Sequence, residues 1–245
     1  AALEVMAVLD HITASDMAQA YPMMQVRAAS RLKARAHPSP VSASGLASNA
    51  VKVHKRKQPY TKFFALQEAD MSVPRFDGGT EERVYRAGFL GTDVSIVLPY
   101  DPIRDRVLLV EQFRFGPFLR DDPNPWLMEP IAGRVDVGET PEMAAMREAD
   151  EESGLALSAL HKVHCGYASP GCSTEYFNTY VGIADIDDDA AILGGLEGEA
   201  EDIQGHILSF SDFLSLLKSG QLPVAPLALA GYWLALNRDV LRKNS

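Results

Sequence analysis

Residues 133–155 read GRVDVGETPEMAAMREADEESGL and contain seven acidic side chains. Thr140 followed by Pro141 is typical of a helix start, because threonine caps free backbone N–H groups and proline suits the first helical position. Gly154 is a typical residue just beyond a helix end. We therefore expect a helix over residues 141–153, flanked by tight turns.

Three carboxylates crowd one face of this predicted helix. At about 100° per residue, Glu148, Glu151 and Glu152 fall within an arc of about 100°. Their repulsion destabilises a helix unless a positive group lies among them. That group is either Arg147 or a divalent cation such as Mg²⁺, which prefers carboxylate oxygens. The alternative is a solvated acidic face with an ordinary Arg147–Glu151 pair. The opposite, core-facing stripe is predicted to consist of Met143, Met146 and Ala149.

The spacing within the stretch fits the pattern G-x5-E-x7-R-E-U-x-E-E-x-G-U, where U is apolar. The matching residues are Gly133, Glu139, Arg147, Glu148, Glu151, Glu152, Gly154 and Leu155. The stretch therefore resembles the Nudix box, although Ala149 is small for an apolar position. This resemblance implies an α/β (α+β) fold in which a mixed β-sheet is sandwiched between helices. It also implies hydrolysis of a nucleoside diphosphate linked to another moiety.

The resemblance implies a role for each residue of the box. Glu148 and Glu152 match metal-binding carboxylates, and Glu151 is a further ligand or a contact of the catalytic water. Arg147 matches the arginine that orients these glutamates, and the carbonyl of Ala132 matches a backbone metal ligand. The expected cofactor is Mg²⁺, with Mn²⁺ as the alternative, to neutralise the pyrophosphate and activate a water.

Residues 57–243 are similar to ADP-ribose pyrophosphatases, including bacterial members associated with tellurite resistance. The matching segments include PYTKFFALQE, LPYDPIRDRVLLVEQFRF, PWLMEPIAGRVDVGE and GLEGEAEDIQGHILSF. The similarity implies cleavage of ADP-ribose to AMP and ribose 5-phosphate. Alternatives are hydrolysis of another nucleotide sugar or dinucleotide, and a sensor that binds nucleotide without turnover.

Four residues outside the box match substrate contacts of these enzymes. Phe63 matches an aromatic that stacks on adenine, and Arg86 a contact delivered from the partner subunit. Arg114 matches a pyrophosphate-binding arginine, and Glu129 a ribose or adenine contact. Phe63 or Phe64 as a core residue, and Arg114 as a plain surface ion pair, are the alternatives.

The acidic stretch GGLEGEAED lies downstream of the box. By composition alone it is a solvated turn. By resemblance it supplies the catalytic base at Glu199 and a further metal ligand at Glu201. Glu197 is the alternative base.

The chain divides into three predicted regions. Residues 1–50 form a helical appendage, interrupted around Ala20–Pro22, and an Ala/Ser/Pro linker. Residues 51–92 form a β-region, and residues 93–245 the hydrolase domain. Because relatives exchange strands between subunits here, the resemblance implies a homodimer with composite active sites. Residues 116–126 are predicted to be irregular, and Ser211 to cap the helix that follows it.

Composition narrows the class of partner. The net charge is −10, and the excess of basic residues is confined to residues 1–60. Nucleic-acid binding requires a basic stripe, so we expect no such partner. The longest apolar run, PLALAGYWLAL, is shorter than the roughly 20 residues that span a bilayer. Cys165 and Cys172 have no metal-binding spacing and are interpreted as buried free thiols of a cytoplasmic protein.

Overall fold

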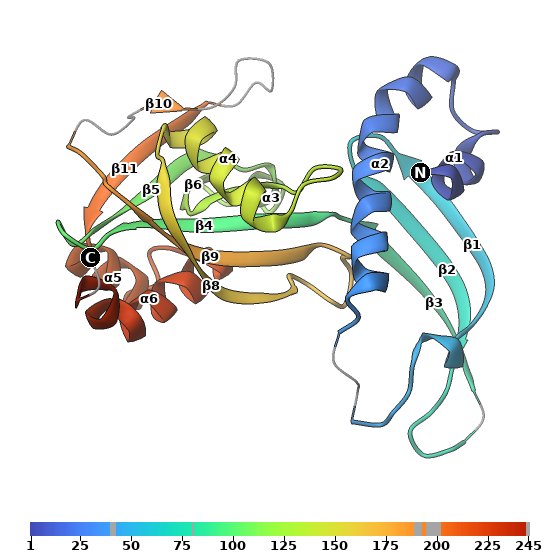
Figure 1. Ribbon diagram of the computed structural model, residues 1–245. Coiled ribbons are helices and arrows are strands. Elements are labelled where there is room, and N and C mark those ends of the chain that lie inside the picture. Colours follow the sequence, from blue (N-terminus) through green and yellow to red (C-terminus); the bar gives the residue numbers. More distant parts are fainter. Residues whose placement is uncertain (40–42, 80, 189–192, 195–201, 244–245) are drawn as a thin grey trace. The chain divides into compact units, whose positions relative to one another are not determined.

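The computed structural model describes residues 1–39, 43–79, 81–188, 193–194 and 202–243, which form two compact units (Figure 1). The first unit comprises Ala1–Asp93, Asp136–Gly138 and Tyr167–Tyr176. The second comprises Val94–Val135, Glu139–Gly166 and Phe177–Ser245. No helix in the described ranges is both long enough and apolar enough to cross a membrane.

Two helices open the first unit, α1 (Ala2–Val8) and α2 (Ala14–Ala36). The predicted interruption around Ala20–Pro22 is wrong, because α2 continues through Pro22. A proline inside a helix removes one hydrogen bond, so packing must compensate. Ala20 and Met24, on either side of the proline, are buried together with Val8 of α1. This small core explains why the helix continues.

A three-stranded antiparallel sheet completes the first unit. Its order is β1 (Lys52–Thr61), β2 (Ala65–Val73) and β3 (Glu82–Leu90), preceded by the short helix η1 (Ser48–Ala50). Thr61 pairs with Ala65, so the three residues 62–64 form the turn between β1 and β2. The Lys62 N–H donates to the Phe64 carbonyl across this turn, at 2.8 Å. The turn is therefore a defined structure that holds Phe63 at its tip.

An eight-stranded sheet forms the centre of the second unit. Six strands follow the order β10-β11-β5-β4-β9-β8, while β6 pairs with β5 and β7 pairs with β4. Their bounds are β4 Asp93–Asp101, β5 Arg106–Phe113, β6 Trp126–Glu129, β7 Ile131–Arg134, β8 Leu157–Tyr167, β9 Tyr176–Ala184, β10 Leu193–Gly194 and β11 Ile203–Ser209. The helices are α3 Phe115–Leu119, α4 Pro141–Ser153, α5 Phe210–Lys218 and α6 Ala225–Lys243.

Alternate residues of the central strands enter two different cores. Leu98 of β4 and Leu109 of β5 pack with side chains of α5 and α6. Val97 and Leu108, their neighbours in sequence, pack with Ala145 and Ala149 of α4. This follows from the two-residue period of a strand. Figure 1 accordingly shows α4 on one side of the sheet and α5 with α6 on the other. The predicted α/β fold, a sheet between helices, is confirmed.

Three local predictions are corrected. The segment 116–126 contains most of the short helix α3, whose Pro117 lies in the first turn, where no intrahelical N–H is needed. Ser209, not Ser211, caps α5, because its hydroxyl accepts from the Asp212 N–H at 3.1 Å and the buried Phe210 already starts the helix. The cysteines are free but not buried: Cys165 is half-buried and Cys172 is exposed.

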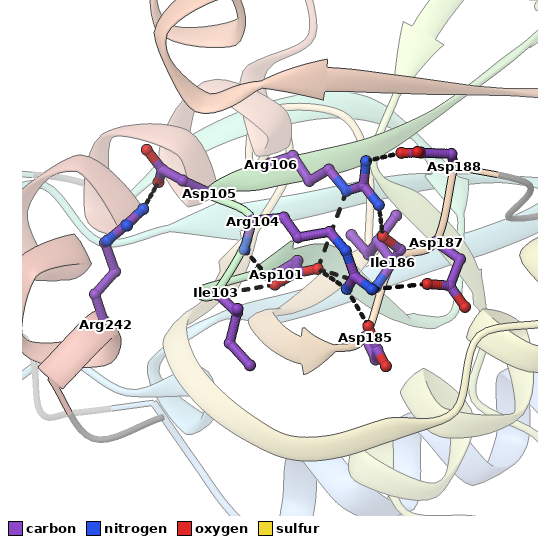
Figure 2. Close-up of polar contacts among 10 residues, drawn as sticks. All are labelled: Asp101, Ile103, Arg104, Asp105, Arg106, Asp185, Ile186, Asp187, Asp188 and Arg242. Carbon is purple, nitrogen blue, oxygen red and sulfur yellow. Dashed lines mark hydrogen bonds and ion pairs between the residues drawn. The ribbon is translucent and has the colours of Figure 1, made fainter.

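Asp101, at the end of β4, organises the turn into β5 (Figure 2). Its buried carboxylate accepts from the backbone N–H groups of Ile103 and Arg104, each at 2.9 Å, and from the Arg104 guanidinium. Burial raises the pKa of this carboxyl, but these hydrogen bonds outweigh it and hold the pKa below its usual value. Arg104 also pairs with Asp185 and Asp187 beyond β9.

Arg106 continues this network along the same segment. Its guanidinium donates to the Ile186 carbonyl and pairs with Asp188, as Figure 2 shows. The Ile186 N–H in turn donates to Asp101 at 3.3 Å. The segment after β9 is thereby tied to the β4–β5 turn as far as Asp188.

Candidate active site

Helix α4 has the ends that its sequence predicts. The Thr140 hydroxyl accepts from the Met143 N–H at 3.2 Å, and Pro141 is the first helical residue. Gly154 ends the helix with φ of 65°, a left-handed conformation that favours glycine. The predicted helix over residues 141–153 is confirmed.

The buried face of α4 agrees with the prediction at Ala149 but not at the two methionines. Met143 and Met146 are 56% and 47% exposed, whereas Ala144, Ala145 and Ala149 are fully buried. The stripe of methionines facing the core is therefore wrong. Alanine is favoured on this face because it lets the helix approach the sheet closely, and a methionine would hold it away.

Glu152 lies within this buried face and is only 5% exposed. It follows Ala145 and Ala149 along the same side of the helix, at the spacing of one helical turn. Burial of a carboxylate is costly unless a positive partner or a metal offsets it. The side chains of Glu148 and Glu151 are 14% and 30% exposed, so these three carboxylates are largely covered. The Arg147–Glu151 pair that the alternative interpretation expected is present.

Gly133 on β7 allows the helix carboxylates to approach the sheet. A Cβ atom at Gly133 would lie 1.7 Å from Oε1 of Glu148, so the carboxylate would have to move away from the strand. Gly133 pairs with Ser95 of β4, so its backbone position is fixed by the sheet. The Glu148 carboxylate therefore rests on bare backbone, one residue after Ala132.

Arg147 is the centre of this cluster. Its Nε and Nη2 donate to the two carboxylate oxygens of Glu139, at 3.0 and 3.1 Å. Its Nη1 donates to Glu148 at 2.7 Å and to Glu151 at 2.8 Å. Nη2 also donates to the Arg134 carbonyl, at 3.1 Å. Hydrogen bonding to Glu139, followed by that to Glu148 and Glu151, raises the pKa of Arg147 above its ordinary value.

Glu139 is a residue whose role the sequence interpretation left open. It occupies a fixed position of the box, and that position was the available signal. Its side chain is 11% exposed and engages Arg147 through both oxygens. A bidentate pair of this kind fixes the orientation of the guanidinium plane. Glu139 therefore orients Arg147, which in turn orients Glu148 and Glu151.

The donor set of this cluster fits a divalent cation. Glu148 offers carboxylate oxygens beside Gly133, and Glu151 offers carboxylate oxygens beside Arg147. Hard cations such as Mg²⁺ bind carboxylates, backbone carbonyls and water. Among the described residues, no group of three or more His, Cys, Asp or Glu is arranged to hold a metal by itself.

The predicted pyrophosphate contact Arg114 is paired with Glu129. Nε and Nη2 of Arg114 both lie 2.6 Å from the same Glu129 oxygen. Arg114 directly follows β5 and Glu129 ends β6, and these strands are paired. The arginine side chain is 39% exposed, so it remains open to an incoming anion. Both the ion pair and a phosphate contact are compatible with this geometry.

Phe63 and Arg86 both belong to the first unit. Phe63 is 49% exposed and Phe64 48%, with their rings in an edge contact at 4.8 Å. The alternative in which either ring is a core residue is therefore wrong. Arg86 is an exposed residue of β3, and its guanidinium donates to the Tyr85 carbonyl at 3.0 Å. Glu197, Glu199 and Glu201 lie outside the described residues.

A family model described as the NUDIX domain matches residues 90–227, more than half of the chain. This range contains Arg147, the glutamates that it orients, and Gly133. The chain belongs to the Nudix family. Divalent metal ions are a general requirement of Nudix hydrolases, in agreement with the carboxylate-rich site on α4.

Individual relatives are consistent with this assignment. An ADP-ribose pyrophosphatase of Escherichia coli (strain K12) is 34% identical over 194 residues, covering 79% of this chain and 92% of that protein. A GDP-mannose pyrophosphatase of Cronobacter sakazakii is 31% identical over 173 residues, covering 69% and 87%. A crystal structure of an ADP compounds hydrolase has a similar fold, with a TM-score of 0.59, 17% identity, and coverage of 80% and 97%.

Proposed function

We propose that this protein hydrolyses ADP-ribose to AMP and ribose 5-phosphate, with Mg²⁺ as its metal ion. The observation that carries the proposal is the box cluster, in which Arg147 binds Glu139, Glu148 and Glu151, and the Glu148 carboxylate lies against the backbone of Gly133. The choice of ADP-ribose is supported by the 34% identity to the E. coli enzyme over most of both chains.

In this proposal Glu148, Glu152 and the Ala132 carbonyl would hold the metal ions, and Glu151 would be a further metal ligand or a contact of the catalytic water. When bound, the ions neutralise the pyrophosphate and lower the pKa of the attacking water. The oxygen of one water forms a bond to one phosphorus, and the bridging P–O bond breaks. Glu199 accepts the proton of that water, with Glu197 as the alternative base. Glu201 is a further metal ligand.

The remaining residues bind the substrate. The exposed Arg114 guanidinium carries the charge needed to bind the pyrophosphate, and Glu129 accepts from ribose hydroxyls or adenine. Phe63, whose ring is half-exposed, stacks on adenine. Arg86 reaches the substrate of a partner subunit, and we infer a homodimer with composite sites. The proposed location is the cytoplasm.

Another nucleotide sugar is the second candidate substrate. It is favoured by the 31% identity to the GDP-mannose pyrophosphatase of C. sakazakii. A comparison of kcat/KM for ADP-ribose, GDP-mannose and a dinucleotide separates the candidates. A preference for either of the last two rejects ADP-ribose as substrate. No hydrolysis of any of them with Mg²⁺ or Mn²⁺ supports a sensor instead.

The direct test is hydrolysis by the full chain, with AMP and ribose 5-phosphate detected by chromatography. Glu152→Gln removes the buried carboxylate and should lower turnover by several orders of magnitude, on the order of 10³-fold. Asp150→Asn is the matched control, since Asp150 is an exposed residue of the same helix. Near-normal turnover in Glu152→Gln rejects the metal-binding role.

A further inference from the structure

A buried ion pair joins the two N-terminal helices. Arg27 of α2 and Glu4 of α1 are each 1% exposed, and Nε and Nη2 of Arg27 lie 2.9 Å from one oxygen of Glu4. Arg31, one turn further along α2, lies 3.2 Å from the other oxygen and is 38% exposed. Burying a charged pair is costly, so we looked for a role of this pair beyond joining the two helices.

The same guanidinium makes a third contact outside the helices. Nη1 of Arg27 donates to the Phe63 carbonyl at 3.0 Å. Phe63 is at the tip of the turn between β1 and β2, and its ring is 49% exposed. The arginine thus fixes the backbone from which the half-exposed ring projects.

Helix α2 is itself held in place, so that it can serve as a support. The Ser30 hydroxyl donates to Asp93 at 2.6 Å, one turn beyond Arg27. Asp93, at the start of β4, is 8% exposed. Met24 and Ala20 of α2 pack with Val8 of α1 on the other side of Arg27. Contacts on both sides of Arg27 therefore hold this part of α2 in place.

We propose that Arg27 is a positioning residue for substrate binding, through which the pair of helices α1 and α2 holds Phe63 in place for the nucleobase. The proposal rests on the proposed function, in which Phe63 stacks on adenine. A ring that is already fixed before the base arrives loses less conformational freedom on binding, and so binds more tightly. In this proposal residues 1–36 support the residue that contacts the nucleobase and are not a separate appendage.

The test compares two identical substitutions on one helix. Arg27→Lys keeps the positive charge for Glu4, but an ammonium group cannot span both the carboxylate and the Phe63 carbonyl. Arg31→Lys is the matched control, because Arg31 shares Glu4 and is not bonded to Phe63. For Arg27→Lys we expect the KM for ADP-ribose to rise about threefold to tenfold, the range for one lost hydrogen bond, with kcat retained. For Arg31→Lys we expect a KM close to that of the unmodified protein.

A double-mutant cycle with Phe63→Ala shows whether Arg27 acts through the ring. Phe63→Ala alone should raise KM about tenfold, as loss of base stacking does. In that background Arg27→Lys should add nothing. If it raises KM equally in both backgrounds, Arg27 does not act through Phe63, and the inference is overturned while the proposed function stands. If Phe63→Ala leaves KM unchanged, the stacking role fails as well.

Circular dichroism of each variant separates positioning from unfolding. If Arg27→Lys loses helical signal, the pair Glu4→Gln with Arg27→Met replaces it, since both buried charges are then removed together. That double variant also lacks the contact to Phe63, so it should show the same rise in KM. A normal KM in a folded double variant overturns the proposal.

Discussion

Arg147 and Arg27 each bind carboxylates, but their surroundings have opposite charge balance. Arg147 is 31% exposed and faces three carboxylates, those of Glu139, Glu148 and Glu151. Arg27 is 1% exposed and shares the single carboxylate of Glu4 with a second arginine. The first cluster carries an excess of negative charge that a cation can relieve, and the second does not. We expect only the first cluster to respond to metal.

The largest predicted effect is on the catalytic base. Glu199→Gln should lower kcat by about 10²- to 10⁴-fold, the usual contribution of a general base, and leave Mg²⁺ affinity unchanged. Single-turnover rates and Mg²⁺ titrations measure the two quantities. If Glu197→Gln causes the loss and Glu199→Gln does not, the assignment of the base is wrong.

Gly133→Ala tests the close approach of helix and sheet. The new Cβ would displace the Glu148 carboxylate, from which it would lie 1.7 Å, and kcat should fall about 100-fold. Gly171→Ala is the control, because a Cβ there meets nothing within 4 Å. Normal activity in Gly133→Ala would mean that the position of Glu148 does not matter for catalysis.

The two arginines should differ in their response to metal. Arg27→Met leaves Glu4 buried without its main partner and should destabilise the fold by about 3–5 kcal/mol, independently of Mg²⁺. Arg147→Met leaves three carboxylates repelling one another, so added Mg²⁺ should raise its Tm more than that of the unmodified protein. Urea unfolding and thermal melting with and without Mg²⁺ provide the data. Equal metal responses would contradict the distinction between the clusters.

The smallest effect concerns Asp105, which like Glu4 is one carboxylate between two arginines, Arg238 and Arg242. Burial raises its pKa, but hydrogen bonds from Arg238 and Tyr100 outweigh this and lower it to about 2. The pKa is depressed in the folded state, so the stabilisation is present above about pH 4 and is lost as pH falls toward 2. It amounts to about 2 kcal/mol.

Unfolding free energies measured between pH 5 and 2 test this sign. In Asp105→Asn the decline over that range should be shallower by about the same 2 kcal/mol. Addition of Mg²⁺ at pH 7 should not alter the effect of Asp105→Asn on the unfolding free energy, because Asp105 lies between two arginines and leaves no excess negative charge. An unchanged decline in Asp105→Asn would show that this carboxyl is not responsible.

The features that could be predicted from sequence are those set by near neighbours in the chain. The ends of α4 depend on Thr140 and Gly154, each of which acts within one turn of the helix. The predicted methionine stripe is wrong because helical periodicity shows which residues share a face but not how much space separates that face from the sheet. Ala144 and Ala145 are buried where the gap is narrow.

Arg27 could not be predicted because its partners are remote. Glu4 is 23 positions away on another helix, and Phe63 is 36 positions away in a turn. Neither contact leaves a periodic or motif-like signal. The role of residues 133–155 could be predicted from their similarity to the Nudix box. Residues 1–36 contain no comparable pattern.

The alanine face of α4 sets how closely the helix approaches the sheet, and Gly133 leaves the space that the Glu148 carboxylate occupies. A larger side chain on the alanine face would push the helix outward and carry Glu148, Glu151 and Glu152 with it as a rigid group. Engineering a different metal preference by changing one glutamate at a time would leave this spacing unaltered. A change of ion size calls for paired substitutions on helix and strand, which adjust the whole carboxylate set in a single step.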